Sequence, residues 1–263
     1  MSEKGTFIGV SIGPGQPGLL TLEAVKTILH TNVIAAPRTR KGEMLAFNIA
    51  RNGISQFLNE SFGFHVTEAS EQTLWASKTL VPLDFPMPRN DPAATLASHQ
   101  AVAEQIKPYL DAGQDVAMLN LGDVSVYATV HYIAELLEAD GYKTNMQAGV
   151  TSFCASAAAL NMSLTGGLET PILIIPGALN DEATERLIRE PGTKILMKTI
   201  GVLPEIIALL KETGQAERTS AVVNCGLPNE QVYPTLAEFE TALREVPKNA
   251  KSYFTTLIVK GEE

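Results

Sequence analysis

Near its N-terminus the sequence reads Phe7-Ile-Gly-Val-Ser-Ile-Gly-Pro-Gly-Gln-Pro-Gly-Leu-Leu-Thr21. Its apolar start predicts a short strand over 7–12, the glycines and prolines predict a tight turn, and a helix is expected to begin near Thr21. A strand, a glycine-rich turn and a helix in this order are typical of a ligand-binding loop in an α/β protein. This stretch therefore decides the fold class, which we predict to be α/β.

The turn over 13–18 matches the dinucleotide pattern G-x-G-x-x-G, but its chemistry does not suit a pyrophosphate. A dinucleotide loop presents backbone N–H groups, and Pro14 and Pro17 have none to offer. The acidic residue expected after the second strand is also missing, because Val33-Ile-Ala-Ala-Pro-Arg38 ends in a proline and a base. We expect the turn to serve a ligand without phosphates, or to pack the strand against another part of the chain.

Composition excludes several classes of protein. The chain has 263 residues, 45% of them hydrophobic and 19% charged, which is ordinary for a globular protein with one large or two small domains. The formal net charge of −9 argues against a general nucleic-acid binder. No apolar run is long enough to span a bilayer, so no membrane partner is expected.

The N-terminus and the cysteines predict a cytoplasmic protein. Met1-Ser-Glu-Lys-Gly5 leads directly into the first strand and lacks the apolar core of a signal peptide. Cys154 and Cys225 lie far apart in the sequence, which favours reduced thiols over a disulfide framework.

A second strand, loop and helix follow in the middle of the chain. Residues 115–121 are apolar almost throughout, as buried parallel strands are, and Gly122 and Asp123 stand at the end of this strand, before a helix predicted over 128–139. Glycine at the carboxyl end of a strand is typical of binding sites in doubly wound sheets. Asp123 has two interpretations: it caps the following helix, or it accepts a hydrogen bond from a ligand hydroxyl or ammonium.

The C-terminal part predicts a second α/β domain. Strands are expected over 171–176, 193–199, 219–224 and 253–259, separated by helices over 181–189, 202–213 and 236–245. We therefore predict an N-terminal domain over 1–148 and a C-terminal domain over 149–263, without a long linker.

The ionisable residues include no recognisable metal or nucleophile motif. The four histidines (His30, His65, His99 and His131) have no metal-like spacing with each other or with the cysteines, so no metal site is expected. No G-x-S-x-G elbow and no Walker loop is present. The basic turn Arg38-Thr-Arg-Lys41 is either a solvated loop or a patch that binds carboxylates. In the proline-rich segment after Asp84, Phe85, Met87 and Arg89 would alternate along a loop that could cover a flat apolar ligand.

Four stretches together resemble the S-adenosylmethionine-dependent tetrapyrrole (corrin/porphyrin) methylase family. They are Val10-Ser-Ile-Gly-Pro-Gly-Gln-Pro-Gly-Leu-Leu-Thr21, Asn120-Leu-Gly-Asp-Val-Ser-Val-Tyr-Ala-Thr129, Gly149-Val-Thr-Ser-Phe153 and Tyr253-Phe-Thr-Thr-Leu-Ile-Val259. Within the family, the segments over 83–87, 89–91 and 151–154 resemble the branch that methylates C20 of precorrin-2 or cobalt-factor II.

The resemblance implies two α/β domains with S-adenosylmethionine bound in the cleft between them, a trough for the reduced tetrapyrrole substrate, and a homodimer. It implies cofactor contacts from Pro14, Leu121, Gly122, Asp123, Val126, Tyr127, Thr151, Ser152, Met197, Gly226 and Thr256. S-adenosylmethionine carries no phosphate, so a turn blocked by prolines does not prevent its binding.

The sequence departs from the family pattern at three places. Gln16 stands where an aspartate is usual, Val124 stands where a proline is usual, and Ala36-Pro37-Arg38 replaces an acidic segment that supplies a proposed proton acceptor in some relatives. No catalytic base is therefore carried over. From the residues themselves, Asp84, His99 and Tyr127 are candidate bases, and the candidate partners for substrate carboxylates are Arg38, Arg40, Lys41 and Arg89.

Other functions remain open on the sequence alone. A methylase of the same fold could act on another corrin carbon, or on an acceptor such as a diphthine precursor or ribosomal RNA. An NADP-dependent oxidoreductase would use Arg38 and Arg40 on the 2′-phosphate, and a non-enzymatic tetrapyrrole carrier would bind its ligand without methyl transfer.

Overall fold

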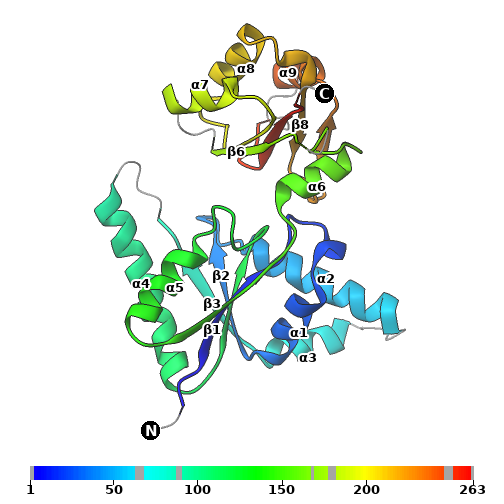
Figure 1. Ribbon diagram of the computed structural model, residues 1–263. Coiled ribbons are helices and arrows are strands. Elements are labelled where there is room, and N and C mark those ends of the chain that lie inside the picture. The colour runs from blue at the N-terminus through cyan, green and yellow to red at the C-terminus, as the bar shows by residue number, and fades with distance from the viewer. Residues whose placement is uncertain are drawn as a thin grey trace. The chain divides into compact units, whose positions relative to one another are not determined.

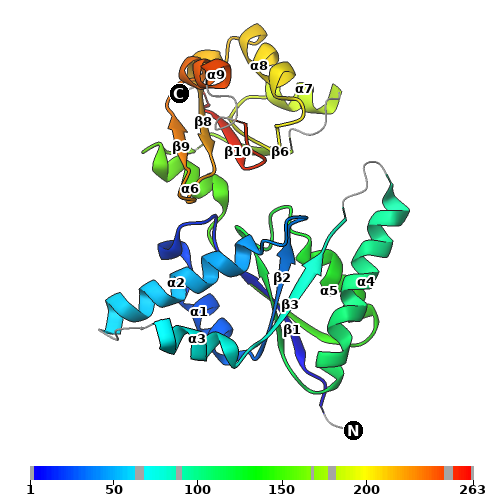
Figure 2. The same ribbon diagram turned by 180° about the vertical axis from the view of Figure 1, so that it is seen from behind.

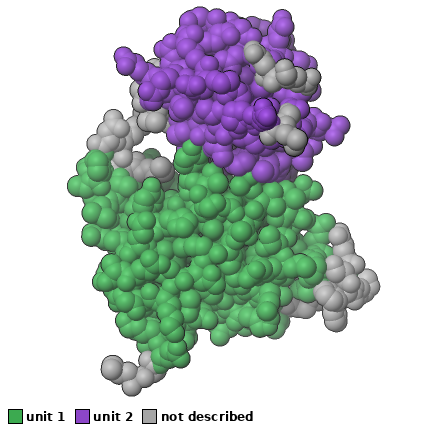
Figure 3. All heavy atoms as spheres, in the orientation of Figure 1, with its two compact units in different colours: residues 1–151 green, residues 152–263 purple. Residues whose placement is uncertain are grey.

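A computed structural model describes residues 3–62, 68–86, 91–166, 169–176, 182–245 and 251–261. The chain divides into two compact units, residues 1–151 and 152–263, which Figure 3 shows in different colours. Each unit has its own five-stranded sheet and its own hydrophobic core, so the prediction of two α/β domains is confirmed. Among the described residues, no helix combines the length and the apolar character that crossing a membrane requires.

Unit 1 alternates strands and helices along the chain. Its elements are β1 (Thr6–Ser11), η1 (Pro17–Leu19), α1 (Leu22–His30), β2 (Val33–Arg38), α2 (Leu45–Phe62), α3 (Glu68–Ala76), β3 (Thr79–Asp84), α4 (Pro92–Asp111), β4 (Val116–Asn120), α5 (Val130–Ala139) and β5 (Lys143–Gln147).

The sheet of unit 1 is parallel, with the strand order β3-β2-β4-β1-β5. Helices α1, α2 and α3 cover one face of this sheet, and α4 and α5 cover the other (Figures 1 and 2). The chain therefore leaves the neighbouring strands β1 and β4 toward opposite faces. Such a topological switch point is where open α/β sheets bind their ligands.

Local sequence explains these elements. The side chain of Thr21 accepts a hydrogen bond from the N–H of Ala24 at 3.1 Å, which caps α1 where the sequence predicted a helix to begin. Four of the five residues of β4 are buried, as expected for a central parallel strand covered on both faces. Phe7, Val116 and Met118 belong to the same buried cluster as Ile133 of α5.

Unit 2 begins with a helix and continues as a mixed sheet. Its elements are α6 (Ser152–Ala159), β6 (Ile172–Pro176), α7 (Glu182–Arg189), β7 (Thr193–Met197), α8 (Leu203–Glu212), η2 (Ala216–Arg218), β8 (Thr219–Val223), β9 (Gln231–Tyr233), α9 (Leu236–Glu245) and β10 (Thr255–Val259).

The strand order in unit 2 is β6-β7-β10-β8-β9, and β10 runs antiparallel to both of its neighbours. Helices α7, α8 and α9 lie together on one face of the sheet, and α6 lies on the other (Figures 1 and 2). Phe239 of α9 is fully buried beside Leu196 and Leu257.

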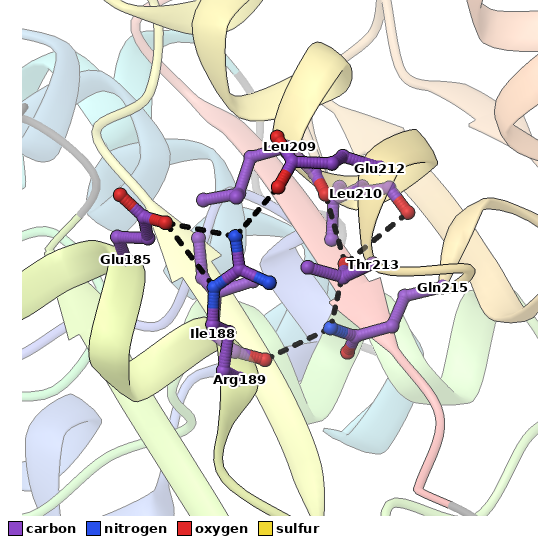
Figure 4. A network of polar contacts seen from close by, with 8 residues as sticks. All are labelled: Glu185, Ile188, Arg189, Leu209, Leu210, Glu212, Thr213 and Gln215. Atoms are coloured by element: carbon purple, nitrogen blue, oxygen red, sulfur yellow. Dashed lines mark hydrogen bonds and ion pairs between the residues drawn. The ribbon is translucent and has the colours of Figure 1, made fainter.

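A polar network joins α7 to α8 in unit 2 (Figure 4). Arg189 donates to Glu185 at 2.8 Å and to Glu212 at 2.7 Å. Nearby, the buried amide of Gln215 donates to the carbonyl of Ile188 at 2.9 Å and accepts from the ammonium of Lys194 at 3.0 Å. Gln215 thereby gives a buried lysine a hydrogen-bond partner.

Besides the short 3₁₀ turns η1 and η2, the described part of the chain contains a helix, α3, and a strand, β9, that the sequence did not predict. The sequence of α3, Glu-Ala-Ser-Glu-Gln-Thr-Leu-Trp-Ala, has little apolar periodicity, and β9 has only three residues. Strand β7 ends at Met197, two residues before the predicted end, because Lys198 has a positive φ of 57°. The alanine-rich stretch over 154–161 predicts a helix, and α6 begins two residues before it, at Ser152.

Candidate functional site

The loops that follow β1 and β4 are paired through their backbones. The N–H of Gly13 donates to the carbonyl of Gly122 at 3.1 Å, and the N–H of Gly122 donates to the carbonyl of Gly13 at 2.7 Å. Both glycines have positive φ values, 72° and 77°, which other residues adopt only with strain. Because each of these N–H groups donates to the carbonyl of the other glycine, neither is available to a phosphate, and Pro14 and Pro17 have no N–H to offer.

Ser11, the last residue of β1, ties these loops to the end of β5. Its buried hydroxyl donates to the carbonyl of Gln147 at 2.6 Å and accepts from the N–H of Val124 at 2.9 Å. A Cβ atom at Gly149 would lie 2.3 Å from the Cβ of Ser11, so only glycine fits there. Neither Ser11 nor Gly149 was predicted as a site residue; a serine at the end of a buried strand was the signal available in the sequence.

Asp123 is the second link between the loops. Its Oδ1 accepts from the N–H of Ser125 at 2.8 Å and from the hydroxyl of the same residue, and its Oδ2 accepts from the N–H of Gly149 at 2.6 Å. The interpretation as a helix cap is wrong, because α5 begins only at Val130. Asp123 instead fixes its own loop and attaches the loop after β5 to it.

The environment of Asp123 favours its ionised form. The residue is only 7% exposed, and burial alone would raise its pKa. The hydrogen bonds from the Ser125 hydroxyl and from the N–H groups of Gly149 and Ser125 outweigh this effect, so the pKa of Asp123 lies below its ordinary value.

The predicted cofactor residues of unit 1 all lie in the loops that follow β1, β4 and β5. They are Pro14, Leu121, Gly122, Asp123, Val126, Tyr127 and Thr151. A Cβ atom at Gly122 would meet nothing within 4 Å, so there is room for a ligand atom beside its Cα. Tyr127 has a positive φ of 51° and is 43% exposed, which places an aromatic side chain at this surface.

Within unit 2, three predicted cofactor residues lie at one end of the sheet. Met197 is the last residue of β7, and Thr256 of β10 lies opposite it in the register of these two strands. Gly226 lies three residues beyond the end of β8. Ser152, the fourth, is the first residue of α6. The Oγ1 of Thr199 is fully buried just beyond Met197 and has no hydrogen-bond partner among the described residues, which the sequence did not indicate.

Unit 2 also has a cavity of about 580 Å³ that none of these predicted cofactor residues lines. Arg189, Lys194, Gln215 and Arg218 are among its lining residues. Lys194 stands at the start of β7, so this cavity is at the opposite end of that strand from Met197.

Two of the candidate residues, the last of β2 and the last of β3, bind each other. Arg38 and Asp84 are paired in register, and the guanidinium donates to both carboxylate oxygens, with Nε 3.0 Å from Oδ1. The bidentate pair raises the pKa of Arg38 and lowers the pKa of Asp84. A lowered pKa makes Asp84 a weaker base, and its partner Arg38 is not a free guanidinium.

Of the other basic candidates, two lie in an exposed turn, and the third belongs to a part of the chain that the structure does not describe. Arg40 and Lys41 are exposed in a turn that is closed by hydrogen bonds between Thr39 and Glu43. Arg89 lies outside the described residues, as does Met87.

His99, the remaining candidate base, lies in an aromatic cluster. Its ring stacks on Tyr132, with centroids 5.0 Å apart and planes 10° apart, and it meets the ring of Phe85 edge-on at 6.2 Å. Burial lowers the pKa of His99 below its ordinary value, so its imidazole is neutral at pH 7.

Within the described part of the chain, no three histidine, cysteine, aspartate or glutamate side chains are placed to hold a metal ion.

Comparison with known proteins gives a family match and full-length relatives. The family model of Tetrapyrrole (Corrin/Porphyrin) Methylases matches residues 6–240. The cobalt-precorrin-2 C(20)-methyltransferase of Salmonella typhimurium is 28% identical over 260 residues, which cover 98% of each chain. The precorrin-2 C(20)-methyltransferase of a Sinorhizobium species is 24% identical over 261 residues, covering 98% of this chain and 96% of that protein.

Solved structures share the fold at lower identity. A cobalt precorrin-4 methyltransferase has a TM-score of 0.67 and 16% identity, covering 97% of this chain and 94% of that one. The uroporphyrin-III C-methyltransferase of Thermus thermophilus, in complex with S-adenosyl homocysteine, has a TM-score of 0.61 and 20% identity, covering 97% and 96%.

The links between the loops that Asp123 and Ser11 form should contribute to stability with different dependences on pH. In Asp123→Asn the amide NH₂ group would face the N–H of Gly149, and in Ser11→Ala the buried N–H of Val124 loses its acceptor. We expect each change to lower the free energy of unfolding by about 1–3 kcal/mol at pH 7.

The pKa of Asp123 is lowered by folding, so its contribution to stability is complete above its ordinary pKa and is lost as the pH falls through the lowered value. In urea unfolding, the difference between wild type and Asp123→Asn should shrink below about pH 4, whereas the difference for Ser11→Ala, which removes no charge, should stay constant. Equal pH profiles for the two variants would contradict this account of Asp123.

Proposed function

Because this chain belongs to the Tetrapyrrole (Corrin/Porphyrin) Methylases, we propose that it transfers the methyl group of S-adenosylmethionine to C20 of precorrin-2 or of its cobalt complex, in cobalamin biosynthesis. The observation that carries this proposal is similarity over nearly the full length to two relatives named as C20-methyltransferases, one for each form of the substrate. The relatives therefore support the acceptor carbon but not a choice between the two forms.

The loops of unit 1 fit a cofactor without phosphates. The N–H groups of Gly13 and Gly122 are occupied, the prolines offer none, and the space beside Gly122 admits a ligand atom at the backbone. We assign the cofactor contacts to the eleven residues that the family resemblance implied. Asp123 is ionised and can accept from an ammonium or hydroxyl group with lone pairs that its internal hydrogen bonds leave available.

The chain's own residues act chiefly by positioning. S-adenosylmethionine supplies an electrophilic methyl group: its C–S bond breaks as a C–C bond forms at C20, and sulfur keeps the electron pair. The loops joined by Ser11, Asp123 and Gly149 would hold the reacting groups in line, an effect that alone can lower the barrier substantially. The proton displaced from C20 then needs an acceptor, which is water or the neutral imidazole of His99. Burial raises the pKa of Tyr127 above its ordinary value, so this candidate is a protonated phenol at pH 7 and is not suited to accept a proton. Asp84 is a weaker base than an unpaired carboxylate, since Arg38 stabilises its ionised form.

The substrate's carboxylates need cations on an acidic protein. Arg40 and Lys41 are exposed beside the carboxyl end of β2, and we assign them this role, with Arg89 as a further candidate from the sequence. Arg38 has a different role: its bonds to Asp84 hold the ends of β2 and β3 together.

We further infer a cytoplasmic homodimer. The free thiols of Cys154 and Cys225 are compatible with a reducing compartment, and the family resemblance implies the dimer. Light scattering should give twice the chain mass of 28.2 kDa, and a single chain mass would contradict the dimer.

The alternatives are less well supported. An NADP-dependent oxidoreductase would need Arg38 on a phosphate, but this residue is paired with Asp84, and the family match points to methyl transfer. A methylase for another corrin carbon shares the fold, but the full-length relatives named above carry the C20 name.

Ligand binding and turnover test the proposal together. Calorimetry should detect binding of S-adenosylhomocysteine but not of NADPH, and mass spectrometry should detect one added methyl group on precorrin-2, cobalt-factor II or both after incubation with S-adenosylmethionine. Binding of NADPH would favour the oxidoreductase. Binding of the tetrapyrrole without methyl transfer would indicate a carrier.

The basic turn gives a separate prediction. Replacing Arg40 and Lys41 with alanine should raise the Kd for cobalt-factor II by about tenfold at low salt and leave S-adenosylhomocysteine binding unchanged, because two exposed ion pairs with substrate carboxylates are lost. The effect should diminish as salt is added. Lys26→Ala, an exposed lysine on α1, is the matched control. An unchanged Kd in the double variant would remove the turn from the substrate site.

A further inference from the structure

Three aromatic side chains of unit 1 form a cluster that the cofactor site does not use. We call Phe85, His99 and Tyr132 the aromatic plate. His99 lies against one face of Tyr132 at a centroid distance of 5.0 Å, and Phe85 supports His99 edge-on at 6.2 Å. The three residues come from three segments: the residue after β3, helix α4 and the first turn of α5.

The plate is not an ordinary part of the core. Phe85 packs on the buried cluster of unit 1, but Tyr132 is 55% exposed, and Leu96, one turn before His99 on the same side of α4, is 50% exposed. The ring of Tyr132 is thus backed by His99 on one face while much of its surface remains open. Exposed neighbouring apolar side chains of this kind are a feature of ligand or partner sites.

The position of the plate relates it to the proposed reaction. Phe85 follows the carboxyl end of β3, and Tyr132 follows the β4 loop that contains Gly122, Asp123 and Tyr127. Since the sheet is parallel, both ends lie on the same edge, with the end of β2 and its basic turn between them. Helices α4 and α5 lie side by side on the face where the plate is formed (Figures 1 and 2).

The chemistry of this edge suits a flat ring with acidic substituents. Three neighbouring strand ends span about 10 Å, which is comparable with the breadth of a tetrapyrrole macrocycle. The plate offers aromatic faces for stacking, and Arg40 and Lys41 offer positive charge in the turn after the intervening strand β2. The bidentate pair of Arg38 and Asp84 fixes the residue that precedes Phe85.

From this arrangement we infer that the aromatic plate is the stacking surface for the substrate macrocycle, with Tyr132 as the ring that contacts it. The inference rests on the proposed function and deepens it, since it names the residues that would hold the plane of the tetrapyrrole. Tyr132 contacts the macrocycle directly and His99 supports the ring of Tyr132, so the plate fixes which edge of the macrocycle reaches the methyl group.

Substitutions at Tyr132 test the inference. Tyr132→Ala should raise the Kd for cobalt-factor II, measured from the shift of its absorption band on binding, by about 3- to 10-fold, because a stacked aromatic pair is lost. Tyr132→Phe retains the ring and should bind within about twofold of wild type. Leu80→Ala, at the other end of β3, replaces an exposed apolar side chain away from the plate and should not change the Kd. All variants should bind S-adenosylhomocysteine as wild type does.

The outcomes separate this inference from the proposed function. If wild type binds and methylates cobalt-factor II and Tyr132→Ala binds it equally well, the plate is not the stacking surface, and a lowered Tm alone would show that it only packs α4 on α5. If Tyr132→Ala changes the mass in light scattering without changing the Kd, a second copy of the chain covers the plate. If wild type neither binds nor methylates precorrin-2 or cobalt-factor II, the proposed function fails, and the inference fails with it.

Discussion

The junction of three strand-end loops in unit 1 is the constraint on which the candidate site depends. Ser11, Asp123 and Gly149 join the loops after β1, β4 and β5 through buried hydrogen bonds, and the backbones of Gly13 and Gly122 pair directly. Buried polar groups that are fully bonded make a rigid framework, because breaking any one bond leaves another group unsatisfied. The junction lies at the topological switch point of a parallel sheet, where open α/β sheets bind ligands.

This junction explains why a glycine-rich turn at this position is not suited to bind phosphate. In a dinucleotide site the free N–H groups face the ligand, whereas here the N–H of Gly13 bonds to the neighbouring loop, and Pro14 and Pro17 have no N–H. What remains is a backbone that a neutral or cationic ligand can approach at Gly122. The same rigid loops lead into α5, whose first turn carries Tyr132, so the proposed cofactor and substrate surfaces share one support.

Much of this arrangement could be predicted from the sequence. Apolar runs and glycine positions located the strands of both units except the three-residue β9, and the two prolines argued against a phosphate cradle. The partnerships were not predictable, because they join residues far apart in the chain: Ser11 with Val124, and Asp123 with Gly149. Asp123 was open to interpretation as a helix cap because aspartate is a common capping residue; in the structure Thr129 stands at the N-cap of α5, without a hydrogen bond from its side chain. Arg38 and Asp84 were assigned separate roles, since only the register of β2 and β3 places them together.

The proposed function requires that these loops direct one methyl group to one carbon, C20. The decisive measurement is to incubate the protein with precorrin-2 or cobalt-factor II and S-adenosylmethionine labelled with ¹³C in its methyl group, and then to locate the label by NMR. We expect a single labelled methyl group on C20 in at least one of the two substrates. A label on another carbon, or no label in either tetrapyrrole, would contradict the proposed function.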